Sequence, residues 1–104
     1  MSEQRDALTL AEVRQRLREQ LPTLRERYGV RGLWLFGSYV RGQQGQNSDL
    51  DILVQFDDRP LSLLGFIALQ NHLSDLTLVK VDLVERETLK PAIGRQILDE
   101  MVPV

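Results

Sequence analysis

The chain has 104 residues, 42% apolar and 27% charged, and a formal net charge of −2. This balance is typical of one globular domain, which we expect to span residues 1–104. Cysteine is absent and His72 is the only histidine, which excludes disulfides and thiolate metal sites and argues against a histidine-based zinc centre. The acidic balance argues against direct nucleic-acid binding. Neither a membrane-length apolar run nor a signal peptide is evident, so we expect a cytoplasmic protein.

The first predicted element is an amphipathic helix that ends at Tyr28. Thr9 and Glu12 have the spacing of a capping box, and apolar residues then recur at three- and four-residue steps. Gly29 is suited to end the helix. Pro22 lies inside this pattern and should kink or split the helix, because proline lacks the N–H group of a helical hydrogen bond.

The rest of the chain alternates between strand and helix patterns. Short apolar runs predict buried strands, helical periodicity predicts helices, and glycine-rich polar stretches predict turns. Trp34 is expected in the core. This order indicates an α/β (α+β) two-layer fold, with a small mixed sheet of about three to four strands and helices packed on one face. The predicted strands are residues 32–36, 49–56 and 77–85, and the predicted helices are a short turn at 38–42, residues 61–76 and residues 88–101.

Two aspartates stand at the start of the second predicted strand. Because side chains alternate across a strand, Asp49 and Asp51 should share one face, about 6.6 Å apart along the backbone, while Leu50 and Ile52 face the core. Two like charges this close repel unless solvent or a cation neutralises them. Asp82, inside the next predicted strand, joins them if the two strands are neighbours. Three such carboxylates are suited to two Mg²⁺ ions and to phosphoryl or nucleotidyl transfer.

Gly37-Ser38 stands where the first predicted strand ends. Glycine lets a ligand approach the backbone closely, and a turn that enters a helix presents N–H groups to anions. The Ser38 hydroxyl adds a hydrogen-bond donor. These features predict a phosphate-binding position facing the aspartates, although the lysine of a P-loop is absent.

Together these residues carry a resemblance to a known family. Gly37-Ser38, ten intervening residues and Asp49-Leu50-Asp51 resemble the GS-x10-DxD signature of the DNA polymerase β-like nucleotidyltransferase superfamily. "FGSYVRG", "SDLDILV" and "VDLV" are most similar to the minimal nucleotidyltransferase (MNT) proteins, the MntA-like antitoxins paired with HEPN toxins. The resemblance covers nearly the whole chain and implies a polymerase β-like nucleotidyltransferase fold.

The resemblance implies catalytic and metal-binding roles for three aspartates. Asp49 and Asp51 match the pair that binds the metal ions. Asp82 matches the third carboxylate, which helps to bind a metal and activates the attacking hydroxyl. The implied cofactor is Mg²⁺, as two ions.

The resemblance also implies the substrates. Gly37 and Ser38 match residues that hold the phosphates of the nucleotide, and Arg41 matches a basic position that contacts phosphate. The implied donor is ATP, and the implied acceptor is a tyrosine of a HEPN ribonuclease toxin. Transfer of AMP would silence that toxin, which makes a hetero-oligomer with the toxin the expected assembly.

Other interpretations of the same residues are open at this point. Asp49 could be only a turn cap, Asp51 an edge-strand charge and Arg41 a solvated surface residue. The chain could also be a non-catalytic antitoxin that neutralises its toxin by binding alone. A further alternative is a small-molecule nucleotidyltransferase that oligomerisation completes.

Overall fold

A computed structural model describes residues 8–45, 48–59 and 61–104. Two residues of the predicted loop, 46 and 47, therefore lie outside the described part of the chain. Among the helices that the structure describes, none combines the length and apolar character needed to cross a membrane. The helices are α1 (Leu10–Tyr28), α2 (Ser38–Arg41), α3 (Leu63–Thr77) and α4 (Pro91–Glu100), with a 3-10 turn η1 (Arg86–Thr88); the strands are β1 (Val30–Phe36), β2 (Leu50–Phe56), β3 (Val81–Glu85) and β4 (Val102–Pro103).

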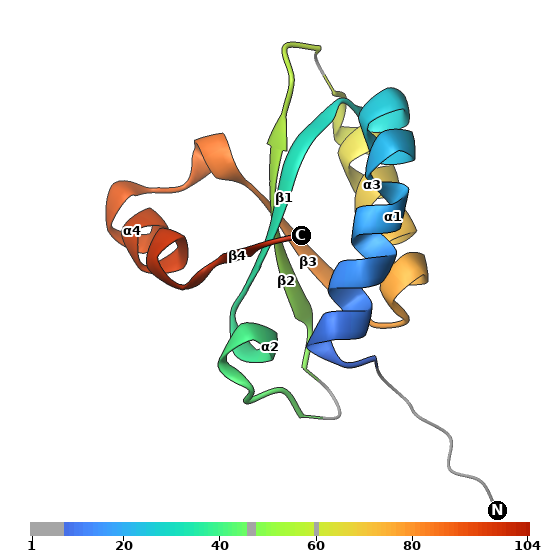
Figure 1. Cartoon of the computed structure of the whole chain (residues 1–104). Coiled ribbons are helices and arrows are strands. Elements are labelled where there is room, and N and C mark those ends of the chain that lie inside the picture. Colours follow the sequence, from blue (N-terminus) through green and yellow to red (C-terminus); the bar gives the residue numbers. More distant parts are fainter. Residues whose placement is uncertain (1–7, 46–47, 60) are drawn as a thin grey trace, which may run out of the picture.

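The four strands form one mixed sheet in the order β3-β2-β1-β4. β1 is antiparallel to both β2 and β4, whereas β2 and β3 are parallel and α3 forms the crossover between them. α1 and α3 cover one face of the sheet, and α4 lies on the opposite side (Figure 1). The predicted fold class is confirmed. One detail differs from the prediction, because α4 does not pack on the face that α1 and α3 cover.

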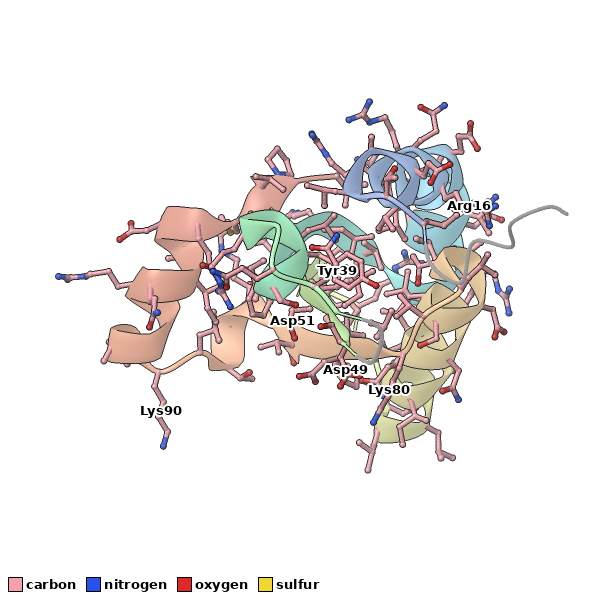
Figure 2. All side chains as sticks on the ribbon, turned by 90° about the horizontal axis from the view of Figure 1, so that it is seen from below. Arg16, Tyr39, Asp49, Asp51, Lys80 and Lys90 are labelled. Carbon is pink, nitrogen blue, oxygen red and sulfur yellow. The ribbon has the colours of Figure 1, made fainter. Side chains whose placement is uncertain are left out.

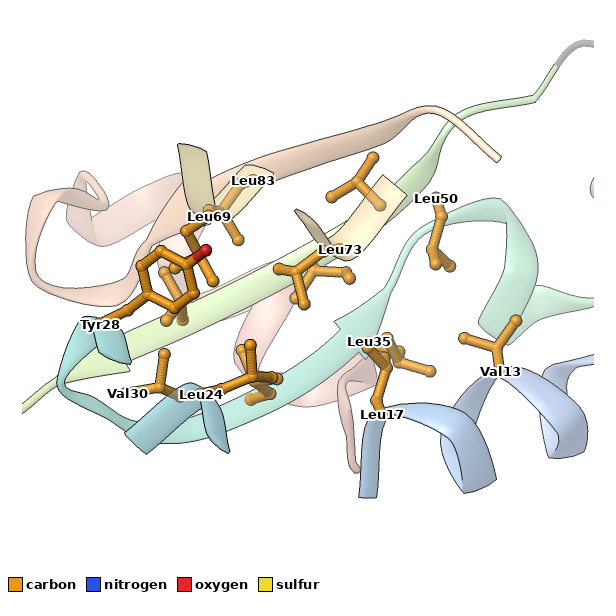
Figure 3. Packing of buried hydrophobic residues seen from close by; sticks show 14 of the residues in the cluster. Val13, Leu17, Leu24, Tyr28, Val30, Leu35, Leu50, Leu69, Leu73 and Leu83 are labelled. Atoms are coloured by element: carbon orange, nitrogen blue, oxygen red, sulfur yellow. The ribbon is translucent and has the colours of Figure 1, made fainter. Parts of the chain in front are cut away.

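The main core lies between the sheet and the pair α1 and α3 (Figure 3). Leu50 and Ile52 are fully buried there, as predicted. Trp34 is not in this core, so that prediction is wrong: it alternates with Leu33 and Leu35 and lies on the other face, with the Arg86 guanidinium carbon 4.9 Å from its ring centroid. The remaining core side chains include Val13, Leu17, Leu24, Leu69, Leu73, Val54, Val81 and Leu83.

α1 begins with the predicted capping box and runs unbroken through Pro22. The Thr9 hydroxyl accepts a hydrogen bond from the Glu12 N–H (3.2 Å), and the Thr9 N–H donates to the Glu12 carboxylate (2.8 Å). The helix ends at Gly29, whose φ of 73° is left-handed. The predicted split at Pro22 is wrong: the ring lies on the exposed face, and packing of Leu24 on the next part of the helix outweighs one missing hydrogen bond.

α3 extends one residue beyond its predicted end, and β3 begins at Val81 instead of residue 77. Thr77 is fully buried, and its hydroxyl donates to the Leu73 carbonyl (2.8 Å). Leu78 then adopts a left-handed φ of 61° and ends the helix. Residues 77–79, predicted to start a strand, therefore form the end of α3 and the turn that follows it.

Side chains of α3 occupy the outer edge of β3. The Ser74 hydroxyl accepts from the Val81 N–H (3.0 Å), and the Gln70 side-chain carbonyl accepts from the Leu83 N–H (3.1 Å). These two backbone groups are those that a further strand would bind. The β3 edge is therefore capped at these two positions by side chains of the same chain.

Side chains of α1 occupy the opposite edge, at β4. This strand was not predicted, and it pairs Pro103 with Trp34 of β1. Arg14 Nε donates to the Pro103 carbonyl oxygen (3.0 Å), and the Arg18 guanidinium donates twice to the Val104 oxygen (3.0 and 2.9 Å). Proline, which has no N–H group, also suits an edge strand.

Candidate active site

The sheet brings the three predicted aspartates together. Asp51 of β2 and Asp82 of β3 are direct partners in the parallel register. Asp49 precedes β2 by one residue, and Figure 2 shows it with Asp51 at the same end of the sheet. Asp49 and Asp82 are exposed, whereas Asp51 is partly buried. The condition for a three-carboxylate cluster, that the two strands are neighbours, is thus met.

Gly37 lies directly against the Asp51 side chain. Phe36, which precedes Gly37, is the antiparallel partner of Asp51, so the turn after β1 passes over this carboxylate. Gly37 has a φ of 81°, and a Cβ atom placed on it would overlap the Asp51 carboxylate. Only glycine allows both this backbone conformation and this close approach.

The electrostatics of the site centre on Asp51. Its pKa is raised from the usual 3.8 to about 6, first by burial and then by repulsion from Asp82 and Asp49. Arg41 opposes this shift, and Glu100 adds to it. The cluster therefore carries an excess of negative charge that a cation would relieve.

The donor set suits a hard divalent cation. Among the residues that the structure describes, no three acidic or histidine side chains already converge into a metal shell. The donors of the cluster are carboxylate oxygens, which Mg²⁺ prefers, and this ion commonly keeps water or substrate phosphate among its ligands. Asp49, Asp51 and Asp82 could thus hold Mg²⁺ with its remaining ligands supplied from outside the protein.

The predicted phosphate-binding residues lie at the turn that precedes and forms α2. Gly37 is the residue before this helix, Ser38 is its half-buried first residue, and Arg41 is its last. Gly42 ends it in a left-handed conformation, as the predicted turn required. The structure therefore places Gly37, Ser38 and Arg41 in one turn beside Asp51.

A fourth carboxylate, Glu100 at the end of α4, also belongs to this site. Its Oε2 accepts a hydrogen bond from the Gly37 N–H (3.0 Å), and Arg41 Nη1 lies 3.0 Å and 3.2 Å from Oε1 and Oε2. No sequence pattern indicated Glu100, because it is 63 residues from Gly37 and part of a surface helix. The Gly37 N–H, expected to be open to an anion, is thus already bound to one.

Comparisons with known proteins agree with this geometry. Residues 17–104 match the nucleotidyltransferase domain family. The chain is 47% identical over 97 residues to a protein named protein adenylyltransferase MntA from Thermococcus cleftensis, covering 93% of this chain and 97% of that protein. A solved structure assigned as a minimal nucleotidyltransferase is 36% identical with a TM-score of 0.77, covering 93% and 97% of the two chains. A toxin–antitoxin crystal structure with AMP-PNP is 26% identical with a TM-score of 0.66, covering 92% and 72%.

Proposed function

Since the chain belongs to the nucleotidyltransferase domain family, we propose that it transfers AMP from ATP to a partner protein. The acceptor is a tyrosine of a HEPN toxin, and the modification silences this toxin, so the chain acts as its antitoxin. The single observation that carries the proposal is the register pairing of Asp51 with Asp82 directly beside Gly37. The protein adenylyltransferase name of the Thermococcus cleftensis relative supports the class of acceptor, and the AMP-PNP complex supports a nucleotide donor.

The reaction is an in-line transfer at the α-phosphorus of ATP. The tyrosine oxygen forms a bond to this phosphorus, the bond to the bridging oxygen of the β-phosphate breaks, and pyrophosphate leaves. The tyrosine proton passes to Asp82, whose exposed carboxylate a hydroxyl of a separate protein can reach. When bound, Mg²⁺ supplies neutralisation of the charge on the phosphates.

Each remaining residue has a role that follows from its position. Asp49 and Asp51 would hold Mg²⁺ together with Asp82. The absent side chain of Gly37 leaves room for the Asp51 carboxylate. The Ser38 hydroxyl and the Arg41 guanidinium donate to phosphate oxygens. The donors hold the triphosphate in place while the carboxylates stay near the reacting phosphorus.

The intact mass of the partner tests this function. The protein is co-expressed with a candidate HEPN toxin partner, as wild type, as Asp49→Ala/Asp51→Ala and as Asp82→Asn. We expect the partner to gain mass in steps of one AMP only with wild type. Asp58→Ala is the matched control, because Asp58 is an exposed aspartate beyond the far end of β2 and should leave the modification intact.

Two results would count against the proposal. A partner that stays unmodified yet is neutralised equally by wild type and Asp49→Ala/Asp51→Ala would support an antitoxin that acts by binding alone. Labelling of a free small molecule in the absence of any partner would support the small-molecule alternative.

A further inference from the structure

We propose that Glu100 is an internal competitor of the nucleotide phosphates and thereby determines the affinity for ATP. This inference rests on the proposed nucleotide-binding role of Gly37 and Arg41. In the structure, the Glu100 carboxylate accepts from the Gly37 N–H at 3.0 Å and pairs with the Arg41 guanidinium at 3.0 Å and 3.2 Å. A phosphate and a carboxylate present similar oxygens to such donors, so the two anions exclude each other.

The backbone around Glu100 indicates which part of the chain must move for the carboxylate to leave. It is the last residue of α4, and β4 begins two residues later and pairs with β1. The Met101 N–H is bonded to the Ile97 carbonyl (2.9 Å), so the backbone on this side of Glu100 is fixed. Rotation of the Glu100 side chain alone therefore opens the position, without movement of the sheet or of the helix.

The contact is weak enough to be displaced. The Arg41 and Glu100 side chains are 46% and 23% exposed, so water screens their attraction. Glu100 also lies close enough to Asp51 to repel its carboxylate. A phosphate that arrives with Mg²⁺ brings its own compensation for the charge of the aspartates, whereas Glu100 brings none.

The expected effect on ATP binding follows from how often the Glu100 side chain occupies the donors of Gly37 and Arg41 and how often it is away from them. If Glu100 occupies the donors in about ten molecules for each molecule in which it is away, ATP binds with an affinity reduced about tenfold. Removing the side chain should recover this factor. Glu100→Gln should recover less, because its amide oxygen still accepts from the Gly37 N–H but no longer pairs with Arg41.

Calorimetric titration with ATP and Mg²⁺ tests the inference on wild type, Glu100→Ala, Glu100→Gln and Asp99→Ala. Asp99 is the matched control, since it is an exposed carboxylate on the same helix and its removal changes the net charge equally. We expect Kd to fall about tenfold for Glu100→Ala, by a smaller factor for Glu100→Gln, and by less than about twofold for Asp99→Ala. Without nucleotide, the amide resonance of Gly37 should shift in Glu100→Ala and not in Asp99→Ala.

An unchanged or higher Kd in Glu100→Ala, with a folded variant by circular dichroism, would overturn the inference. An unmoved Gly37 resonance would overturn it too, independently of any nucleotide. The proposed function can fail separately. If Glu100→Ala binds ATP more tightly but wild type transfers no AMP to the partner, the role of Glu100 as a competitor stands and the proposed adenylylation is overturned. AMP transfer by wild type, together with equal Kd values for wild type and Glu100→Ala, would keep the proposed function and overturn the role of Glu100 as a competitor.

Discussion

The contact of Gly37 with Asp51 joins the two parts of the candidate site, which are the turn that forms α2 and the group of aspartates. The Gly37 N–H also donates to Glu100, so one glycine meets two carboxylates. The structure brings Gly37 and Asp51 of the sequence motif together, because the turn after β1 leads back to the paired strand β2, and their roles in the site stay predictions. The motif could not locate Glu100, because the tertiary position of α4 brings that side chain to α2. No local sequence pattern reports this position.

Gly37→Ala should remove AMP transfer and lower the free energy of unfolding by about 1–3 kcal/mol, since its Cβ atom overlaps the Asp51 carboxylate and its φ is left-handed. Gly42→Ala is the matched control: Gly42 has a φ of 71°, but its added Cβ meets nothing within 4 Å. It should cost about 1 kcal/mol and retain transfer. Urea unfolding and the mass assay measure both effects, and equal losses in the two variants would contradict the close-contact argument.

Asp51 should make the metal-free protein less stable as the pH rises. Its pKa is about 6 in the folded protein and 3.8 in the unfolded chain, so the folded state binds more protons between these values. The stability that protonated Asp51 contributes is present below pH 4 and is lost through pH 6. Asp51→Asn should therefore be more stable than wild type by about 1–2 kcal/mol at pH 8 in EDTA, and nearly equal at pH 4.

The measurement is urea unfolding at both pH values, with Asp58→Asn as the control. Asp58 is exposed and outside the site, so its substitution should change stability equally at pH 4 and pH 8. A difference for Asp51→Asn that does not grow with pH would show that the carboxylate is not held in an unfavourable environment.

At the scale of elements, the parallel pair of β2 and β3 assembles the carboxylates, and α3 makes this pairing possible. The sequence predicted most of these elements because their apolar patterns are regular. It misplaced the start of β3, where an apolar run served a helix end, and it missed β4, which is too short to show alternation. Both errors occur where tertiary contacts, not local periodicity, decide the conformation.

Gln70→Ala should lower the free energy of unfolding by about 1–2 kcal/mol, because the Leu83 N–H at the edge of β3 loses its acceptor. Asn71→Ala, at the exposed neighbouring position of the same helix, should change it by less than about 0.5 kcal/mol. Amide hydrogen exchange should show faster exchange of Leu83 in Gln70→Ala only. Unchanged protection of Leu83 would mean that the side chain does not secure this edge.

At the scale of the whole molecule, the chain is acidic overall, and the charges of Asp49, Asp82, Glu100 and Arg41 all act on Asp51. Residues from the turn after β1, from β2, from β3 and from the end of α4 meet there. Binding of a divalent cation at this point should stabilise the entire fold, because the ligands come from segments that separate on unfolding.

Mg²⁺ at about ten times its Kd should therefore add about 1.4 kcal/mol of stability and raise the Tm by several degrees. Asp49→Asn/Asp51→Asn should lose this increase, whereas Asp58→Asn should keep it. Thermal unfolding followed by circular dichroism, with and without EDTA, measures the shift. An equal increase in all three proteins would indicate a general ionic effect and no bound ion at the aspartates.

The capped edges of the sheet also bear on how this protein meets other proteins. Gln70 and Ser74 accept from two backbone N–H groups at one edge, those of Leu83 and Val81. Arg14 and Arg18 donate to two backbone oxygens at the other edge, those of Pro103 and Val104. A second polypeptide therefore finds no unsatisfied ladder at these positions along which to continue the sheet. At these positions association must use side-chain surfaces, which disfavours the strand-to-strand pairing that builds fibrils.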